Sequence, residues 1–364
     1  METDIAKTND HAYLKARIAK DHTAQFDSIT PVIPANALVE ITNACNHRCI
    51  FCASPRMNRK RGILDIALYE KFLDEAIMQG LQEVGLYSTG ESFLVKDLDR
   101  YIALTKSKGI GHIYISTNGA LASPERVIPA IEAGLTSIKF SVNAASRENY
   151  RLTHGKDDFD KVIDNIKFVS DYRKEHNINL KLLVTYVATK FTEGEKETIH
   201  DILGSYVDEI MIFDVHPQAG QALMLLDEIQ CASLRKDTRQ HNAKPGPCPY
   251  LWNRLHLSCE GYLTFCCVDY EIALTFADLN TTPLKEAWHN HLAQEMRQRH
   301  KDGNLKGTLC QNCLHKTQEP VFPISRIGHE DTTKTIASDN PHGTRSINER
   351  IREFTVKKGW NNGH

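Results

Sequence analysis

Residues 38–52 read LVEITNACNHRCIFC, and this short stretch decides the fold class and the chemistry of the chain. Its first five residues form an apolar run of the length and composition typical of a buried strand. Three cysteines follow this strand directly, with the spacing Cys-x3-Cys-x2-Cys. Cysteines gathered in a loop at the end of a strand predict a metal or redox centre at one edge of a sheet.

Three thiolates can hold three irons of a [4Fe–4S] cluster, which normally takes four cysteines. A set of three therefore leaves one iron with an open position, where a reactive ligand can bind. The alternative is a structural zinc site that uses His47 as its fourth ligand.

The rest of the first half alternates apolar runs with amphipathic segments. The spacing of apolar residues predicts helices over residues 65–80, 123–134 and 158–176. Asp65 is expected to be the N-cap of the first helix. Strands are expected at residues 38–42, 83–88, 112–116, 137–142, 180–187 and 209–213. Six strands that alternate with helices predict an α/β fold, a partial (β/α)6 barrel with its active groups at the C-terminal strand ends.

Composition limits the partners and the compartment. The 364 residues are 41% hydrophobic and carry a formal net charge of −2, so no nucleic acid and no membrane are expected as partners. The polar N-terminus lacks a signal peptide, and no run approaches the roughly 18 apolar residues that span a bilayer. A cytoplasmic location is expected, where ten cysteines indicate metal or redox chemistry rather than disulfides. The basic run Arg59-Lys60-Arg61 is expected to be a solvated loop.

The cysteine pattern resembles the hallmark of the radical S-adenosylmethionine (SAM) superfamily, which has an aromatic residue, here Phe51, before the last cysteine. The resemblance implies that Cys45, Cys49 and Cys52 hold a [4Fe–4S] cluster whose open iron binds SAM. Reduction of that cluster cleaves SAM to a 5′-deoxyadenosyl radical, which abstracts hydrogen from the substrate. The cofactor supplies the difficult chemistry, and the protein orients and shields it.

Three strand ends extend this resemblance. Thr89-Gly90-Glu91 is similar to the Gly-Gly-Glu-type motif that binds the SAM amino group, with threonine in place of the first glycine. The next two strand ends carry short polar residues where the family contacts the ribose or carboxylate of SAM, although such residues also form ordinary turns. The resemblance thus implies a cofactor-binding set of Phe51, Thr89, Gly90, Glu91, Ser116, Asn118, Ser141 and Asn143.

A second group of cysteines resembles the SPASM domain, or its shortened twitch form. Cys248 is followed by Cys266, and Cys310 and Cys313 form a later Cys-x2-Cys pair. The resemblance implies one auxiliary [4Fe–4S] cluster held by these four residues. Two questions stay open: a zinc knuckle completed by Cys259 or His315 is the alternative, and any of Cys259, Cys266 and Cys267 could supply the middle ligand, because neighbours on a strand face opposite ways.

We therefore expect four parts in the chain. Residues 1–36 form an N-terminal extension, and residues 37–235 form the radical SAM partial barrel. Residues 236–320 form a small α+β auxiliary-cluster domain, with a hairpin over 254–268 and a helix over 284–300. Residues 321–364 form a polar tail, partly disordered.

The natural use of an auxiliary cluster with four cysteine ligands is electron transfer. Twitch-type relatives include an aminocyclitol dehydrogenase, so the resemblance implies a dehydrogenase or epimerase acting on an amino sugar, aminocyclitol or nucleotide sugar. Its electron donor would be a flavodoxin or ferredoxin. Oxidation of an alcohol needs a base, and the candidates at the strand ends are Asp214, His216 and Tyr186, with Arg147 as a further one. The alternatives are a radical SAM enzyme that modifies a peptide or protein, and a metal-binding scaffold without catalytic activity.

Overall fold

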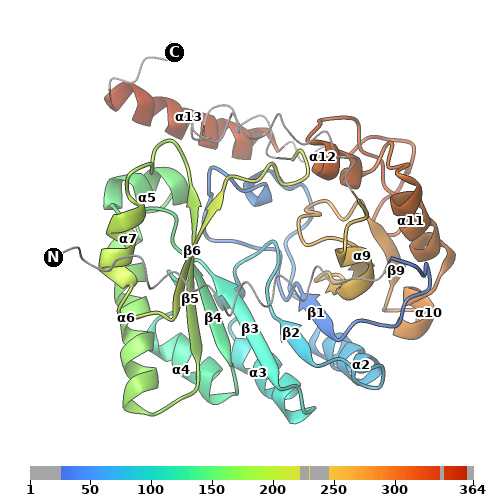
Figure 1. Ribbon diagram of the computed structural model, residues 1–364, viewed down its shortest axis with the longest axis horizontal. Helices are drawn as coiled ribbons and strands as arrows, with labels where there is room; N and C mark the ends of the chain where they lie inside the picture. The colour runs from blue at the N-terminus through green and yellow to red at the C-terminus, as the bar shows by residue number, and fades with distance from the viewer. Residues whose placement is uncertain (1–25, 222–228, 230–245, 337–339, 359–364) are drawn as a thin grey trace.

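The computed structural model describes residues 26–221, 229, 246–336 and 340–358. Its centre is one nine-stranded sheet with the order β6-β5-β4-β3-β2-β1-β7-β8-β9 (Figure 1). The first six strands are parallel, which confirms the predicted α/β fold with its parallel sheet. They are β1 (Asn36–Val39), β2 (Glu83–Gly85), β3 (His112–Thr117), β4 (Ser137–Ser141), β5 (Lys181–Ala188) and β6 (Glu209–Asp214).

The C-terminal domain continues the sheet of the barrel. Strand β7 (Leu255–Leu257) pairs in parallel with β1, so β1 lies between β2 and β7. Strands β8 (Tyr262–Thr264) and β9 (Thr275–Asp278) then extend the sheet in antiparallel fashion. The predicted hairpin is present, but its pairing with β1 was not predicted, because no local sequence pattern encodes it. Strands β1 and β8 therefore belong to one continuous sheet, and the loops that follow them extend from that sheet.

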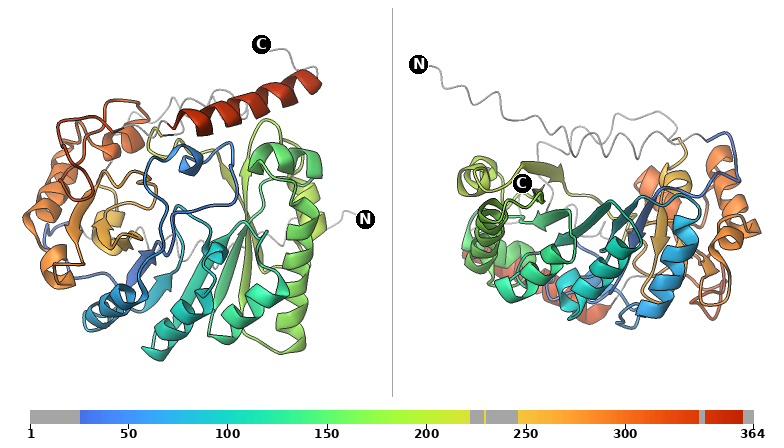
Figure 2. Two further views of the ribbon diagram at one scale, coloured as in Figure 1. Left: turned by 180° about the vertical axis from the view of Figure 1, so that it is seen from behind. Right: turned by 90° about the horizontal axis from the view of Figure 1, so that it is seen from below.

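The helices of the barrel cover the outer face of the curved sheet (Figure 2). Asp65 caps the first of them as predicted, since its carboxylate accepts hydrogen bonds from the backbone N–H groups of Ala67 and Leu68, each at 2.9 Å. No helix in the described part of the chain has the length and hydropathy needed to cross a membrane. The helices are α2 (Ile66–Ile77), α3 (Leu98–Ser107), α4 (Pro124–Glu132), α5 (Arg147–His154), α6 (Phe159–Glu175) and α7 (Lys196–Leu203), with short 3-10 turns η2 (Ser54–Arg56) and η3 (Ser92–Leu94).

The helical segment predicted over residues 284–300 is two helices. It breaks at Asn290, whose side-chain oxygen accepts from the backbone N–H of Ala293 and so begins a new helix. The buried indole of Trp288 donates to the carbonyl of Pro31, which fastens the segment before β1 to this domain. The helices here are α9 (Tyr250–Asn253), α10 (Leu284–Trp288), α11 (His291–Asp302) and α12 (Leu309–His315).

The prediction of a polar, partly disordered C-terminal tail is wrong over residues 341–357, which form helix α13 (Pro341–Lys357). One face of α13 carries Ile347, Ile351 and Phe354, which are buried at helical spacing. They pack against Ile50 and Phe51 from the loop after β1. The apolar residues are few among many charged ones, so composition alone hid the helix. It lies across the top of the barrel in Figure 1.

Phe354→Ala is expected to lower the free energy of unfolding by about 3 kcal/mol, the usual cost of emptying a buried aromatic site. Urea denaturation of the full chain under anaerobic conditions measures the change. The matched control is Val356→Ala on the same helix, where the side chain is 73% exposed and the expected change is within about 0.5 kcal/mol. Equal, small effects in both variants would show that α13 does not stabilise the fold.

Candidate active site

The loop that follows β1 carries Cys45, Cys49 and Cys52 as half-buried free thiols; residues 43–53 are called the cysteine loop below. Burial, and then the charges of the other two cysteines, raise the pKa of Cys49 well above its usual value. Burial and the nearby Glu91 raise the pKa of Cys45 to about 12. Three thiols that repel one another as anions fit a cationic centre, which would hold all three as thiolates. The donor set therefore fits an iron–sulfur cluster.

Residues 59–62 form a second loop, which is hydrogen-bonded to the cysteine loop. The guanidinium of Arg61 donates to the carbonyls of Asn43 at 2.5 Å and Ser54 at 2.8 Å. The side chain of Asn43 donates to the carbonyl of Lys60 and accepts from the N–H of Gly62, each at 2.9 Å. Both ends of the cysteine loop are thus fixed by side chains, which holds the sulfur atoms in place.

Arg59 lies in a buried ion-pair cluster. Its guanidinium contacts Glu40 at 2.7 Å and Glu260 at 2.6 Å, and the Arg59 and Glu40 side chains are only 6% and 4% exposed. Burial opposes the charge on Arg59, but the two carboxylates more than offset it and raise its pKa. Glu40 also accepts from the backbone N–H of Cys259. The expectation that the basic run is a solvated loop is therefore wrong for Arg59, whose side chain is buried, whereas Lys60 and Arg61 are exposed.

A pair of histidines lies behind the cysteine loop. The backbone N–H of Asn143 donates to Nε2 of His154 at 3.2 Å, so this nitrogen is an acceptor and the neutral ring carries its proton on Nδ1. His154 Nδ1 lies 3.7 Å from the sulfur of Cys49 and 3.3 Å from Nδ1 of His47. Burial lowers the pKa of His154 well below its usual value, so the ring stays neutral. The one proton on Nδ1 of His154 therefore faces both Nδ1 of His47, at the shorter distance, and the sulfur of Cys49.

A zinc site completed by His47 does not fit this arrangement. Nε2 of His47 lies 3.1 Å from the carboxylate of Asp158 and donates to it, and Nδ1 accepts from His154. Both ring nitrogens of His47 are therefore engaged, so neither is available as a ligand. His47, Cys49 and His154 do converge, but as a hydrogen-bonded group.

Gly90 and Glu91 lie in the loop after β2, against the cysteine loop, where the N–H of Glu91 donates to the carbonyl of Ala44. A Cβ atom at Gly90 would stand 2.3 Å from the carbonyl oxygen of Thr42 and 2.6 Å from that of Ala44, so only glycine fits. Glu91 is 2% exposed and accepts from the hydroxyl of Thr117 at 2.7 Å and the N–H of Asn118 at 2.7 Å. Burial raises the pKa of Glu91, and these donors oppose the rise. A carboxylate fixed beside Cys45 is suited to accept an ammonium group.

The other predicted cofactor-binding residues divide into three sets. The Asn118 side chain donates to Asn46 at 2.8 Å, so it borders the cysteine loop. Thr89 and Asn143 are engaged inside the protein: the Thr89 hydroxyl donates to Glu40, and the Asn143 amide bonds to His154 and to the N–H of Val187. The side chains of these two residues are thus hydrogen-bonded to other residues of the protein, which the sequence could not show. Phe51 is buried on the α13 side, and Ser116 and Ser141 lie half-buried on β3 and β4.

The second cysteine group also assembles. Electrostatic contacts join Cys248 with Cys313 and Cys267, and Cys310 with Cys248 and Cys313. Cys266 and Cys267 both lie with this set, as free thiols. Cys259 lies instead beside Arg59, with its sulfur 3.8 Å from the guanidinium, and next to Glu40 and Glu260.

One contact joins the segment after Cys267 to the first cysteine group, and a second joins that segment to the loop after β2. The hydroxyl of Tyr270, three residues after Cys267, lies 3.5 Å from the sulfur of Cys52. The hydroxyl of Ser88, at the end of the loop from β2, donates to the carbonyl of Cys267 at 3.3 Å. Tyr270 is 5% exposed. The segment 266–270 is therefore packed directly between the two sets of sulfur atoms.

The candidate bases differ in what they can do. His216 accepts the backbone N–H of Gln218 at Nδ1 at 2.9 Å, so the neutral ring carries its proton on Nε2 and acts as a donor, not a base. Tyr186 is fully buried and its hydroxyl donates to the carbonyl of Thr192. Arg147 forms an ion pair with Asp157 on the outer surface. Asp214, exposed at the end of β6, is the candidate that keeps a carboxylate available.

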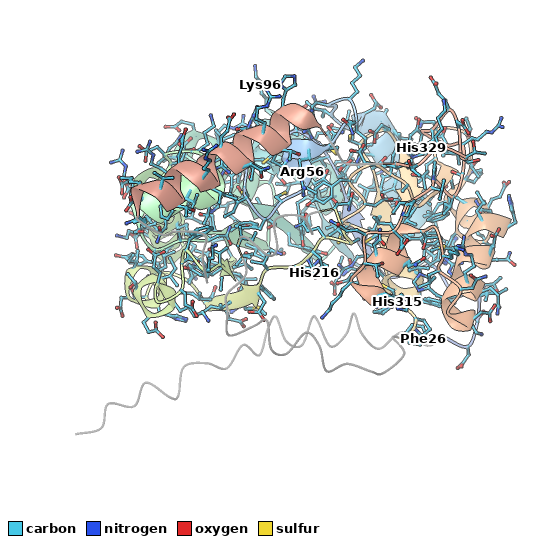
Figure 3. All side chains as sticks on the ribbon, turned by 90° about the horizontal axis from the view of Figure 1, so that it is seen from above. Phe26, Arg56, Lys96, His216, His315 and His329 are labelled. Carbon is cyan, nitrogen blue, oxygen red and sulfur yellow. The ribbon has the colours of Figure 1, made fainter. Side chains whose placement is uncertain are left out.

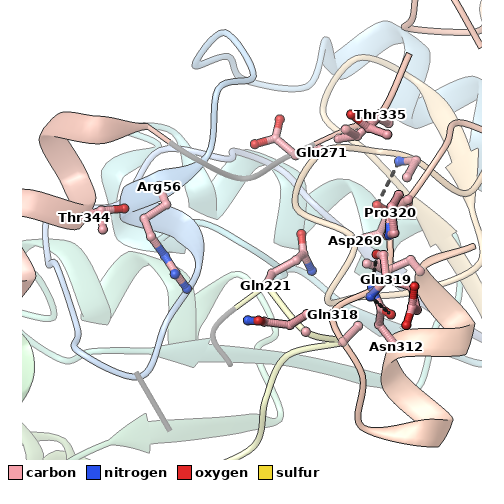
Figure 4. A pocket seen from close by; sticks show the side chains of 16 residues that line it. Arg56, Gln221, Asp269, Glu271, Asn312, Gln318, Glu319, Pro320, Thr335 and Thr344 are labelled. Atoms are coloured by element: carbon pink, nitrogen blue, oxygen red, sulfur yellow. Dashed lines mark hydrogen bonds between the residues drawn. The ribbon is translucent and has the colours of Figure 1, made fainter. Parts of the chain in front are cut away.

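A cavity of about 380 Å³ opens between the barrel and the C-terminal domain (Figure 4). Arg56 enters it from η2, just after Cys52, and Asn312 enters from α12, between Cys310 and Cys313. Figure 3 shows Arg56 and His216 in this central region, between the barrel and the C-terminal domain. Its other polar lining includes Gln221, Asp269 and Glu271. The cavity thus adjoins both cysteine-bearing loops.

Two protein-family models match the chain. The model described as the radical SAM superfamily matches residues 39–202, and the SPASM model, an iron–sulfur cluster-binding domain, matches residues 248–314. The first match contains the cysteine loop and Glu91. The second contains Cys248, Cys266 and the pair in α12.

Similar curated proteins match over about half of the chain. The uncharacterized protein MJ0804 of Methanocaldococcus jannaschii is 32% identical over 215 residues, which cover 56% of this chain and 69% of that protein. A probable GTP 3′,8-cyclase of Sulfurisphaera tokodaii is 30% identical over 183 residues, or 49% of this chain and 55% of that protein. The chain therefore spans only about half the length of the cyclase.

Two solved structures share the fold. SuiB of Streptococcus suis, bound to the precursor peptide SuiA, has a TM-score of 0.59 and 16% identity, covering 93% of this chain and 83% of that one. BtrN, in complex with AdoMet and 2-DOIA, has a TM-score of 0.52 and 17% identity, covering 79% of this chain and 96% of that one. At these identities the likeness concerns the fold alone.

Proposed function

Because this chain belongs to the radical SAM superfamily and carries a SPASM iron–sulfur domain, we propose that it is a radical SAM dehydrogenase that oxidises an alcohol of a small polar molecule. When bound, SAM with its cluster supplies a hydrogen-abstracting radical, and the auxiliary cluster supplies a one-electron acceptor. The substrate would lose one hydrogen atom, one proton and one electron, which converts a CH–OH group to a carbonyl.

The residues of the chain have separate roles in this proposal. Cys45, Cys49 and Cys52 hold the first cluster, and Glu91 accepts hydrogen bonds from the SAM ammonium group. Asp214 takes the hydroxyl proton, because among the candidate bases at the strand ends it has an exposed carboxylate that can accept one. Cys248, Cys266, Cys310 and Cys313 hold the second cluster.

The observation that carries the proposal is the packing of segment 266–270 between the two cysteine groups. Its Tyr270 contacts the sulfur of Cys52, and its first residue belongs to the second group. Two redox centres placed on one sheet and joined by a single segment suit the passage of an electron from a substrate held between them.

The cavity supports a small polar substrate. A volume of about 380 Å³ falls at the small end of the range for small-molecule sites, and the lining offers Arg56, Glu271 and amide groups as hydrogen-bond partners. An amino sugar, an aminocyclitol or a nucleotide sugar presents the hydroxyl and amino groups that such a lining recognises.

The relatives named as probable GTP 3′,8-cyclases favour a second candidate, a redox-neutral rearrangement of a purine nucleotide. In that reaction the substrate would not deliver an electron to the second cysteine group. The two candidates therefore differ in what happens when that group is disabled.

The double variant Cys310→Ala/Cys313→Ala is expected to retain formation of 5′-deoxyadenosine from SAM and to lose the oxidised product, because the electron acceptor is gone. The assay is anaerobic, with dithionite as reductant and with aminocyclitols, amino sugars, nucleotide sugars and GTP tested in turn. Mass spectrometry records deuterium transfer from labelled substrate into 5′-deoxyadenosine and a product two hydrogens lighter. The iron content should fall by about four atoms.

The matched control is Cys259→Ala, which removes a cysteine that lies beside Arg59 and should keep the full iron content. A product of unchanged mass from GTP in the wild type would overturn the dehydrogenase proposal in favour of the rearrangement.

A further inference from the structure

Tyr270 belongs to the C-terminal domain, but its side chain contacts the first cysteine group. Its hydroxyl lies 3.5 Å from the sulfur of Cys52, which is its one hydrogen-bond partner in the part of the chain that the structure describes. The backbone N–H of Ser54 donates to the same sulfur at 3.4 Å. A thiolate sulfur has no proton to give, so in the form of Cys52 that binds iron the sulfur accepts and Tyr270 donates.

The ring of Tyr270 is held in a small apolar cluster. Ala53 and Met57 are buried with it, and Cys52 and Val268 pack against this cluster. Tyr270 itself is only 5% exposed, so little water reaches the hydroxyl. A hydrogen bond in such an apolar environment is electrostatically stronger than the same bond at the surface.

The backbone around Tyr270 is fixed by hydrogen bonds on both sides. The guanidinium of Arg59 donates to the carbonyl of Tyr270 at 3.3 Å, and the backbone N–H of Asn58 donates to the carboxylate of Glu271 at 2.8 Å. The buried carboxylate of Asp269 accepts from two backbone N–H groups of the turn that follows, at 2.8 and 2.7 Å. The hydroxyl is therefore held in place, and its hydrogen bond requires little further ordering.

We propose that the Tyr270 hydroxyl raises the reduction potential of the cluster held by Cys45, Cys49 and Cys52, by donating a hydrogen bond to the Cys52 sulfur. Reduction adds one electron to the cluster, and no covalent bond forms or breaks. Part of the added negative charge resides on the cysteine sulfurs, so a donor to one of them stabilises the reduced state more than the oxidised state. The proposal rests on membership in the radical SAM superfamily, and not on the proposed oxidation of a substrate.

The C-terminal domain thus helps to set the potential of a cluster that the barrel holds. Tyr270 stands three residues after Cys267, whose carbonyl accepts from the hydroxyl of Ser88 at 3.3 Å. The segment that carries Tyr270 is therefore tied both to the second cysteine group and to the loop after β2. Its position determines the length of the hydrogen bond to Cys52.

The test compares Tyr270→Phe with Tyr101→Phe in the reconstituted holoprotein, without SAM and without substrate. Tyr101 is a matched control, because it is 3% exposed on α3 and its hydroxyl donates to the carbonyl of Leu64. Electron paramagnetic resonance follows reduction by dithionite in the presence of redox mediators at fixed pH. The variant in which the three cysteines of the cysteine loop are changed to alanine identifies the signal of the second cluster, which is then subtracted.

Tyr270→Phe is expected to keep about eight irons and to lower the equilibrium constant for reduction of the first cluster about tenfold, a shift of about −59 mV for a one-electron couple. Tyr101→Phe should keep the wild-type potential. Placing 3-fluorotyrosine at position 270 makes the opposite change, because its more acidic hydroxyl is a stronger donor. This protein should show a potential above that of the wild type.

An unchanged potential in Tyr270→Phe with full iron content would overturn the proposal. So would an equal shift in Tyr101→Phe, since the loss of any buried hydroxyl would then move the potential. If Tyr270→Phe lost iron, the fluorinated protein would decide, because it keeps both ring and hydroxyl: a raised potential supports the proposal, and an unchanged one overturns it. No readout involves substrate, so a failure here is distinct from a failure of the dehydrogenase proposal.

Discussion

The variant with Cys45, Cys49 and Cys52 all changed to alanine is expected to retain about four of the roughly eight irons of the reconstituted wild type and to form no 5′-deoxyadenosine. These three thiols are the only ligands that the cysteine loop offers, since His47 and His154 are engaged by each other, by Asp158 and by Asn143. Anaerobic iron and sulfide analysis and chromatography of the SAM cleavage products measure both effects.

The reciprocal variant Cys310→Ala/Cys313→Ala is the control, because it should lose the other set of irons and still cleave SAM. About four irons in the wild type and almost none in the triple variant would show that the second group holds no cluster. The proposed electron acceptor would then be absent, and a redox-neutral reaction would become the leading function.

Arg59→Ala is expected to lower the free energy of unfolding by about 3 to 5 kcal/mol, the usual cost of breaking a buried ion pair by removing one partner. The change leaves the carboxylate of Glu40, whose side chain is 4% exposed, without its cation. Glu40 also holds the hydroxyl of Thr89 and the backbone N–H of Cys259, so its environment links β1 to β2 and to the hairpin after β7. Anaerobic chemical denaturation measures the loss.

Arg100→Ala provides the comparison, because the exposed pair of Arg100 with Asp97 is worth at most about 1 kcal/mol. A loss of similar size in both variants would mean that the Arg59 cluster adds no more stability than a surface pair does. The double variant Arg59→Met/Glu40→Gln should recover part of the loss, since it removes the uncompensated charge.

The α/β fold class was predictable because the strand and helix periods are local properties of the sequence. Asp65 caps its helix as its position predicts, and the six parallel strands appear within a few residues of their expected places. The cysteine spacing was equally informative, since a set of three within eight residues has few other uses. Helix α13 was missed because its three buried apolar residues are separated by charged ones, and its partner surface lies 300 residues away in the chain.

The roles of single polar residues were less predictable. Asn143 and Thr89 stand at strand ends, where cofactor contacts were expected, yet their side chains are bonded to His154 and Glu40. No local sequence pattern identifies His154 as a residue of the site. Its position there depends on the packing of the end of α5 against the cysteine loop. Which nitrogen of a histidine is protonated depends on donors brought from other elements, and so does its chemistry.

By itself, the sequence determined that this protein has a parallel α/β sheet with a three-cysteine loop after its first strand, because periodicity and spacing act between near neighbours in the chain. Only the tertiary structure decided that β7 joins β1, that the Arg59 side chain is buried in an ion-pair cluster, and that α13 covers the cysteine loop. These features depend on contacts between distant segments. Their free energy comes from burying apolar surface and from pairing the charges that become buried, and no local pattern records which segments will meet.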